Sequence, residues 1–226
     1  MNCLITGGSG FIGSNLTLAL RNAGHRVITI DLHSPKLVQP HFYVPGDITT
    51  PGLLEAVLRS HEIQVVIHLA AVSTIQAGMA DGEKAIQTNL GGTRALLQAL
   101  DATGHQAILI HASTDKVYGP LIGGTQYTED TPLAPLSDSP YDWSEAQADK
   151  LVMDWLRKAP TTRGWSFAFA IFMAPLTCIP AGSSPGVSWP CVPGRQVLSI
   201  ITPTPPAMPG PSAVTCCTAR TCAGYS

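Results

Sequence analysis

Charged residues are scarce in this sequence, and acidic residues are absent after Asp154. Lysine and arginine together number 13 and aspartate and glutamate 15, which gives 12% charged residues and a formal net charge of −2. Because no polybasic tract stands out, the charge pattern argues against nucleic-acid binding and against attraction to an anionic membrane surface. We therefore expect neither kind of partner.

Long apolar runs are also lacking. The stretch "WSFAFAIFMAPL" is apolar but shorter than the roughly 18 residues that a membrane helix needs, so it fits a buried strand better. The start, "MNCLITGG", has no basic region followed by a long apolar run, and so does not resemble a signal peptide. By default we expect a cytoplasmic protein with no membrane partner.

The cysteines follow no pattern that indicates a metal site or a disulfide framework. Cys3 lies in the first apolar run, where a buried and inert thiol is expected. The spacing of the others matches no zinc-binding pattern, and disulfides are not expected without an export signal. These remaining cysteines are Cys178, Cys191, Cys216, Cys217 and Cys222.

Short apolar runs alternate with segments of helical periodicity through residues 1 to about 172. Apolar strands that alternate with helices predict an α/β, Rossmann-type doubly wound parallel sheet. Gly24 and Gly104 stand where two of the helices should end. Strands are expected at 2–7, 25–31, 64–71, 106–113 and 165–172, with a weaker one at 41–47, and helices at 11–24, 50–62, 83–104 and 141–159.

The composition changes after about residue 172. Pro, Ser, Thr, Gly and Cys dominate from Pro175 onward, and only short pieces such as "RQVLSIIT" keep any periodicity. Repeated prolines remove backbone donors and interrupt helices, so we expect an irregular, poorly ordered tail at 173–226 after a domain at 1–172. The abrupt change leaves two interpretations open, a naturally disordered tail and a tail translated out of frame from near residues 170–172.

A glycine-rich turn follows the first predicted strand and opens the first predicted helix. Gly7 permits the tight turn, Gly10 leaves room for a pyrophosphate, and Gly13 lets helix and strand pack closely. The helix N-terminus offers free N–H groups to phosphate. Asp31 ends the next strand, where a carboxylate can accept hydrogen bonds from ribose hydroxyls and would repel a 2′-phosphate. The pattern predicts a dinucleotide site that favours NAD over NADP; a glycine-rich turn with a surface aspartate is the alternative.

The turn "TGGSGFIG" resembles the opening of the NAD-dependent epimerase/dehydratase family, within the extended short-chain dehydrogenase/reductases. Further motifs similar to those of this family follow in the expected order up to about residue 172. As a set they are most similar to those of nucleotide-sugar 4,6-dehydratases and 4-epimerases. They are "GDI" (46–48), "HLAA" (68–71), "TNLGGT" (88–93), "STDKVYG" (113–119) and "TEDTPLAPLSDSPY" (128–141).

This resemblance implies a fold, a cofactor and a reaction. The family has six or seven parallel strands in one sheet and a smaller C-terminal domain that grips the nucleotide sugar. It holds NAD tightly, takes a hydride from C4 of the sugar and later returns it. Family members commonly dimerise through two helices, so a homodimer is a further expectation.

The resemblance also assigns roles to individual residues. Thr114 would hydrogen-bond the sugar O4, Asp115 would protonate a leaving hydroxyl as in the dehydratases, and Tyr141 would be the catalytic base. Contacts with NAD are implied for Gly7, Gly10, Phe11, Ile12, Gly13, Asp31, Asp47, Ile48, Leu69, Ala70, Ala71, Thr88, Tyr141 and Glu145.

Several of these residues have a structural alternative. Thr114 suits a strand-end turn or a helix cap, and Asp47 suits a strand-end turn. Small residues at Ala70 and Ala71 suit tight helix–sheet packing as well as a nearby cofactor. Asn89 interrupts a helical run at some cost in helix propensity, which suggests a specific role, although a solvated side chain is the alternative.

Two residues depart from the family pattern. Lys116 stands where the dehydratases carry a glutamate that removes the C5 proton, which weakens that assignment. Glu145 stands four residues after Tyr141, where the family has a lysine that lowers the phenol pKa and holds the nicotinamide ribose. A carboxylate on the same helix face should raise that pKa. Lys150 lies on the opposite face and is no substitute.

The sequence leaves three functional hypotheses open. The first is a nucleotide-sugar epimerase or dehydratase with bound NAD, impaired by Glu145 and by the aberrant C-terminal region. The second is an NAD-binding pseudoenzyme or cofactor sensor. The third is a defective product with no selected role, in which the sheet would lose the cover that the family's C-terminal part supplies.

Overall fold

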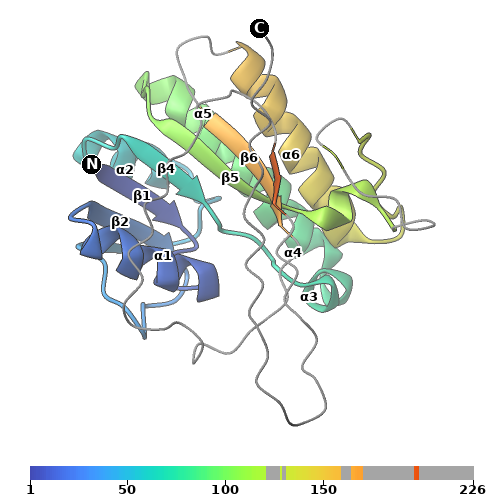
Figure 1. The fold of residues 1–226 in the computed structure, drawn as a ribbon, viewed down its shortest axis with the longest axis horizontal. Helices are drawn as coiled ribbons and strands as arrows, with labels where there is room; N and C mark the ends of the chain where they lie inside the picture. Colours follow the sequence, from blue (N-terminus) through green and yellow to red (C-terminus); the bar gives the residue numbers. More distant parts are fainter. Residues whose placement is uncertain (121–127, 129–130, 159–163, 170–195, 199–226) are drawn as a thin grey trace, which may run out of the picture.

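A parallel sheet forms the centre of the molecule (Figure 1). The computed structural model describes residues 1–120, 128, 131–158, 164–169 and 196–198. Within these residues the sheet has 7 strands in the order β3-β2-β1-β4-β5-β6-β7. The strands are β1 (Asn2–Thr6), β2 (Arg26–Asp31), β3 (Phe42–Pro45), β4 (Val65–His68), β5 (Ile108–Thr114), β6 (Gly164–Phe169) and β7 (Gln196–Leu198).

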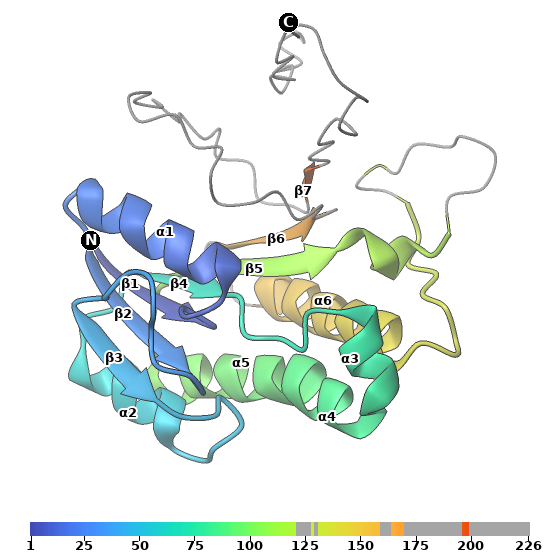
Figure 2. The same ribbon diagram turned by 90° about the horizontal axis from the view of Figure 1, so that it is seen from below.

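Helices cover both faces of this sheet, as the predicted doubly wound fold requires. Figure 2 shows α1 on one face and α2, α5 and α6 on the other. A π-helix, η1 (Gln87–Gly91), joins α4 to α5, and a 3-10 turn, η2 (Asp115–Tyr118), follows β5. The helices are α1 (Phe11–Asn22), α2 (Leu53–Ser60), α3 (Ile75–Ala80), α4 (Gly82–Ile86), α5 (Gly92–Thr103) and α6 (Pro140–Lys158).

The order of the strands reverses between β1 and β4. The chain runs outward from β1 to β2 and β3, then crosses back to place β4 on the other side of β1. All pairings are parallel, and Thr6 of β1 lies beside His68 of β4. A crevice at the carboxyl ends of strands is expected where the order reverses, so this arrangement fixes where a ligand can bind.

Each face of the sheet packs into a separate core. Leu4 and Ile28 point to the side that packs with Leu96, Leu100 and Val152 of α5 and α6. A second core, toward α1, is formed by the alternate strand residues Cys3, Ile5, Val27, Val65 and Ile67. Leu16 and Leu20 of α1 are partly buried and pack against it. Burial on both faces explains why these strands read as unbroken apolar runs.

Helix ends follow local backbone chemistry. Gly24 and Gly104 have φ of 77° and 63°; Gly24 follows Ala23, the C-cap of α1, and Gly104 is the C-cap of α5, as predicted from their positions. Left-handed glycines end helices without a side-chain penalty. At α6, the Ser139 hydroxyl accepts a 3.2 Å hydrogen bond from the Asp142 N–H, and Pro140 occupies the first helical position, where proline is favoured.

Some element boundaries differ from the sequence-based prediction. The expected helix at 83–104 is divided into α4, η1 and α5, and α3 was not predicted because its six residues have little periodicity. β7 falls in the segment expected to be an irregular tail. The predicted strand end at 170–172 lies outside the described residues, as does most of the tail at 173–226, so the domain boundary stays a prediction. Within the described residues, no helix is both long and apolar enough to span a bilayer.

Asn89 in the π-helix η1 connects three elements and is 2% exposed. Its side-chain oxygen accepts a 2.7 Å hydrogen bond from the Val72 N–H, and its amide group donates to the Val72 carbonyl and, at 3.1 Å, to Ser144 Oγ of α6. This fixes the loop after β4 against α6. Of the two interpretations of Asn89, the structure therefore supports the specific role over a solvated side chain.

We predict that Asn89→Ala lowers the free energy of unfolding by about 1–3 kcal/mol, because it removes the hydrogen bonds of Asn89 to the partly buried Val72 backbone and to the buried Ser144 hydroxyl. Urea denaturation measures this. Gln87→Ala in the same π-helix removes only an exposed hydrogen bond to Glu83 and serves as the control. An Asn89→Ala protein as stable as Gln87→Ala would contradict this role.

Candidate active site

One cavity of about 570 Å³ opens at the carboxyl ends of the strands, beside the point where the strand order reverses. It extends from Asp31 at the end of β2 to Tyr141 and Glu145 on α6. Every residue that the sequence predicts to have a site role lies on its wall. These are Gly7, Gly10, Phe11, Ile12, Gly13, Asp31, Asp47, Ile48, Leu69, Ala70, Ala71, Thr88, Thr114, Asp115, Tyr141 and Glu145.

The glycine turn after β1 is shaped by close backbone contacts. Gly7 has φ of 74°, and a Cβ there would lie 2.8 Å from the Ala70 nitrogen. A Cβ at Gly13 would lie 2.4 Å from the Gly7 carbonyl oxygen, so α1 packs against the turn only because both residues lack side chains. At Gly10 such a Cβ would meet a single atom, the Gly7 carbonyl oxygen at 3.3 Å, and the rest of its surroundings open into the cavity.

The N-terminus of α1 faces the cavity without a capping side chain. Gly10 is its N-cap and makes no side-chain hydrogen bond, while Phe11, Ile12 and Gly13 of the first turn line the cavity. The first N–H groups of a helix have no partner inside the helix and carry the positive end of its dipole. This end of the cavity is therefore suited to an anionic group such as a pyrophosphate.

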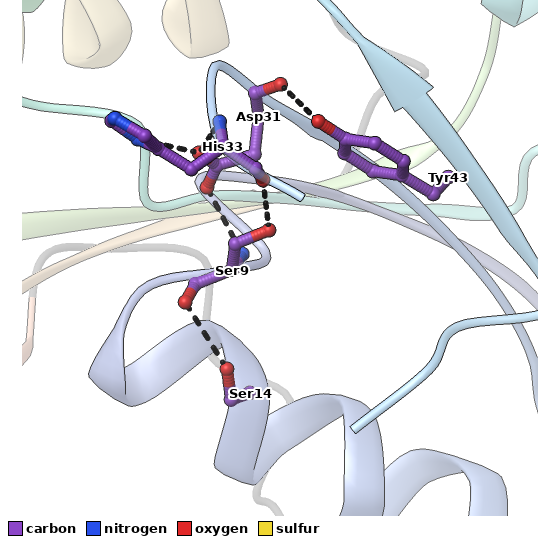
Figure 3. Close-up of polar contacts among 5 residues, drawn as sticks. All are labelled: Ser9, Ser14, Asp31, His33 and Tyr43. Carbon is purple, nitrogen blue, oxygen red and sulfur yellow. Dashed lines mark hydrogen bonds and ion pairs between the residues drawn. The ribbon is translucent and has the colours of Figure 1, made fainter. Parts of the chain in front are cut away.

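Asp31 ties the glycine turn to the loop after β2 (Figure 3). One carboxylate oxygen accepts a hydrogen bond from the Ser9 N–H at 3.0 Å, and the other accepts one from the His33 N–H at 2.9 Å. The Ser9 hydroxyl donates to the His33 carbonyl, and Tyr43 donates to the Asp31 carbonyl. Each carboxylate oxygen keeps a further lone pair, with which it could accept a ribose hydroxyl.

Asp47 has a structural role of its own beside this end of the cavity. Its Oδ1 accepts hydrogen bonds from the Thr49 N–H and the Thr49 hydroxyl, both at 2.8 Å. That is the strand-end turn which the sequence left as an alternative to a cofactor contact. Ile48 packs against the start of α5, where a Cβ on Gly92 would lie 2.2 Å from the Ile48 side chain.

Thr114 and Asp115 lie at the carboxyl end of β5. The Thr114 hydroxyl donates to Asp115 Oδ1 at 3.2 Å and accepts from the Lys116 N–H at 3.4 Å, so Thr114 also caps the η2 turn. Lys116 Nζ lies 3.3 Å from Asp115 Oδ2 in an ion pair. Lys116 lines the cavity as part of this pair, and its side chain is 44% exposed.

Tyr141 and Glu145 lie one turn apart on α6 and are 8% and 5% exposed. Burial, then the neighbouring Glu145, raises the pKa of the Tyr141 phenol, while a hydrogen bond with Thr114 acts in the opposite direction. The direction expected from Glu145 is therefore found, although burial is the larger cause. Lys150 is exposed on the same helix, as its spacing predicted.

Glu145 belongs to a row of buried acids on α6. Asp142 and Asp149 are 2% and 1% exposed, and their spacing places all three on one helix face. Burial, then Asp149 and Asp142, raises the pKa of Glu145 to about 8. At neutral pH Glu145 is therefore mostly a neutral acid, which corrects the view of it as a permanent carboxylate.

Two buried histidines lie beneath the cavity floor. The rings of His68 on β4 and His111 on β5 stack with 5.5 Å between centroids. His68 contacts the Thr6 hydroxyl at 2.6 Å and the Thr93 hydroxyl at 3.0 Å. Burial, then His111, lowers the pKa of His68 to about 3, and burial lowers that of His111 to about 4. Both are therefore neutral at physiological pH.

This geometry agrees with a match to a known family. The model of the NAD dependent epimerase/dehydratase family matches residues 3–171. The chain belongs to this family. The match covers β1 to β6, α1 to α6 and every residue of the candidate site.

Individual relatives agree with this assignment. A dTDP-glucose 4,6-dehydratase of Xanthomonas campestris is 38% identical over 167 residues, which are 66% of this chain and 47% of that protein. The NAD complex of a Thermus thermophilus UDP-glucose 4-epimerase has a TM-score of 0.68 at 28% identity, covering 75% of this chain and 55% of that one. For the NAD complex of a Bacillus anthracis dTDP-glucose 4,6-dehydratase the TM-score is 0.65 at 31% identity, with 77% and 56% covered.

The chain spans about half the length of the curated relatives it matches. What those proteins act on is therefore not transferred to this chain without argument. The residues present nevertheless suit the family's cofactor: the space above Gly10, the uncapped α1 N-terminus and the Asp31 carboxylate line one continuous cavity.

Sequence reasoning missed several residues of the site. His33, Ser73, Thr74, Ile75 and Ser113 also line the cavity. His33 could have been found because it follows Asp31 by two residues, and Ser113 because it precedes Thr114. The burial of Asp142 and Asp149 has no signal in a single sequence, whereas that of His111 follows from its place in the apolar run predicted as a strand at 106–113. Within the described residues, no cluster of His, Cys, Asp and Glu could hold a metal ion.

We predict that Gly13→Ala weakens NAD binding at least about tenfold, since the added Cβ must displace the Gly7 carbonyl and so reshape the turn. Isothermal titration calorimetry measures the affinity. Gly91→Ala is the matched control, because a Cβ there meets only one atom, at 4.0 Å. Equal affinities for the two variants would contradict the turn as the phosphate-binding element.

We predict opposite pH effects from Glu145 and the histidines. The carboxyl pKa of Glu145 is near ~4.3 in the unfolded chain and about 8 in the folded protein. The stability that this difference contributes is fully present at a pH below ~4.3 and is lost as the pH rises toward about 8. The pKa values of His68 and His111 are lowered in the folded protein, so their contribution to stability is present at a pH above ~6.5. That contribution is lost as the pH falls toward about 4. Only Glu145 of the three titrates between pH 6.5 and 8.

Over that interval the wild-type protein should therefore lose on the order of 1–2 kcal/mol of stability relative to Glu145→Gln. Urea denaturation of both proteins at several pH values measures the difference. A difference between the two proteins that does not change with pH would show that Glu145 titrates normally.

Proposed function

We propose that this chain binds NAD with a nucleotide sugar at the Thr114–Tyr141 end of the cavity, and that it transfers hydride at sugar C4 slowly. This proposal rests on the observation that the two ends of an NAD–sugar site line one cavity. Thr114 and Tyr141 lie at one end of it, and Asp31 and the α1 N-terminus lie at the other. Bound NAD would accept a hydride from the sugar and return it.

The residues at the reacting end have separate roles in this proposal. Thr114 would donate a hydrogen bond to the sugar O4, and Tyr141 would remove the proton from that hydroxyl. Asp115 would supply a proton to a leaving hydroxyl only in a dehydration. Because Asp115 is already paired with Lys116, the arrangement favours C4 epimerisation over 4,6-dehydration as the reaction.

Burial, and then Glu145, limits this chemistry through the ionisation of Tyr141, because position 145 supplies no cation to offset the burial. A phenol is a general base only as phenolate, and an ordinary tyrosine has a pKa near ~10. Here burial and Glu145 raise that pKa further. The fraction of phenolate at neutral pH is therefore smaller than for a solvated tyrosine, and slow turnover is the expected consequence.

The raised Tyr141 pKa also favours a second candidate function, an NAD-binding protein without turnover. In this alternative the cavity and the Asp31 end keep their cofactor role while Tyr141 remains protonated. The two candidates differ in one measurable property, which is product formed per bound NAD with a suitable nucleotide sugar.

We predict that Glu145→Lys raises turnover of a nucleotide sugar at least about tenfold, because a cation in place of the acid lowers the Tyr141 pKa by one unit or more. UDP-glucose, dTDP-glucose and UDP-glucuronic acid, with bound NAD, form the assay panel. Calorimetry with NAD first confirms that the variant keeps its cofactor site.

Asp154→Lys is the matched control, since it also replaces an acid with a lysine, at an exposed position on α6. Its turnover should equal that of the natural chain. If Glu145→Lys gives no gain over Asp154→Lys while binding NAD, Glu145 is not what limits the reaction. If neither protein binds NAD, the proposed function itself fails.

The assembly and location of the protein stay predictions. A homodimer is supported by apolar side chains that are 58%, 36% and 39% exposed on α3, α4 and α6, namely Met79, Ile86 and Trp143. Sedimentation of the purified chain decides between monomer and dimer. The cytoplasmic location rests on the sequence alone.

A further inference from the structure

Glu145 lies in the wall between the large cavity and a second, much smaller one. The small cavity offers about 10 Å³ to the centre of a water-sized sphere and is lined by His68, His111, Asn89, Thr93 and Glu145, among others. A space of roughly 10–15 Å³ on this scale holds a single water molecule. Glu145 is thus in a position to contact both a cofactor and a buried water.

His111 supplies the second observation at this small cavity. It is 3% exposed, and neither of its ring nitrogens has a hydrogen-bond partner within the described part of the chain. The adjacent His68, in contrast, has partners on both nitrogens. A neutral imidazole has one donor and one acceptor, and leaving them unused in the interior is unfavourable. A water in the small cavity would give one of the two His111 ring nitrogens a partner.

We propose that one buried water joins His111 to Glu145, and that Glu145 carries a proton in the free protein and releases it when oxidised, positively charged NAD binds. This inference rests on the proposed function, because it takes NAD to be the ligand of the large cavity. The His111 N–H donates to the water, and the water donates to the carboxylate that remains after the proton has left.

The charges around Glu145 make its proton sensitive to a nearby cation. Asp142 and Asp149 are its charged neighbours on α6. His68 of β4 and His111 of β5 line the small cavity with it. Tyr141 of α6, with Asp115 and Lys116 of η2, lines the large cavity with it. The other elements packed against α6 carry charged groups only at exposed positions, namely Glu83, Lys84, Arg94 and Asp101. The immediate surroundings are therefore acidic or neutral, apart from the Lys116–Asp115 pair.

Proton release then follows from simple electrostatics. In the free protein, burial and the two neighbouring acids keep Glu145 protonated at neutral pH. Asp31 and the α1 N-terminus would hold the adenosine and pyrophosphate end of a dinucleotide, which leaves the Tyr141 and Glu145 end of the cavity for the nicotinamide. A positive nicotinamide ring favours the carboxylate, and one proton passes to solvent for each NAD bound. NADH lacks that ring charge and leaves the proton in place.

The test counts protons by isothermal titration calorimetry at pH 7 in phosphate and in Tris, buffers with different ionisation enthalpies. The wild-type chain should release about 0.9 proton per NAD, the protonated fraction of an acid with a pKa of about 8, and close to none with NADH. Glu145→Gln should bind both cofactors without proton release. Asp154→Asn, which removes an exposed acid from the same helix, should behave like the wild-type chain.

A second variant tests the role of the water. His111→Phe keeps a ring stacked on His68 but removes the donor to the water, so proton release with NAD should fall below about half of the wild-type value. Infrared difference spectroscopy of the wild-type chain should show the carbonyl band of a protonated carboxylic acid disappear with NAD, and this band should be absent from Glu145→Gln.

The possible outcomes separate this inference from the proposed function. Equal proton counts for NAD and NADH in the wild-type chain would overturn the inference while leaving cofactor binding intact. Full proton release in His111→Phe would contradict the part of the inference that links His111 to Glu145 through a water. A chain that binds neither cofactor would overturn both proposals.

Discussion

The backbone contact between Gly7 and the end of β4 determines where everything else in the site can lie. Gly7 has a positive φ, and the Leu69–Ala70 backbone is so close that a Cβ would lie 2.8 Å from it. This contact holds the turn after β1 against the neighbouring strand at the point where the sheet order reverses. The N-terminus of α1, the Asp31 carboxylate and the cavity between them are placed by that turn.

A second constraint comes from the buried face of α6. Asp142, Glu145 and Asp149 share that face, and ionising all three in a dry interior would be costly. Holding a proton on Glu145 relieves part of this cost, which is why its pKa rises. Replacing a family lysine by glutamate therefore does more than reverse a charge. It makes the charge at the reacting end of the cavity depend on pH and on what is bound there.

The features that could be predicted from the sequence are those fixed by local backbone chemistry. The glycine turn, the strand-end Asp31 and the helix stops at Gly24 and Gly104 each reflect a requirement that one residue type meets. The features that could not be predicted depend on tertiary contacts. Burial as the main cause of the Tyr141 and Glu145 shifts, the hydrogen bonds of Asn89 and the unpartnered ring of His111 arise only when distant segments meet.

Tyr141 and Glu145 cannot act as a catalytic pair, because no pH gives both side chains the ionisation state that the reaction needs. Tyr141 needs a pH above its raised pKa to become phenolate, whereas Glu145 is uncharged only below about 8. No pH combines a phenolate with a neutral acid beside it. A lysine would serve both requirements at once, since its cation stabilises the phenolate and donates hydrogen bonds to a ribose. In this chain those tasks are separated: Glu145 can still accept a hydrogen bond from a cofactor hydroxyl, but it gives Tyr141 no help in losing its proton.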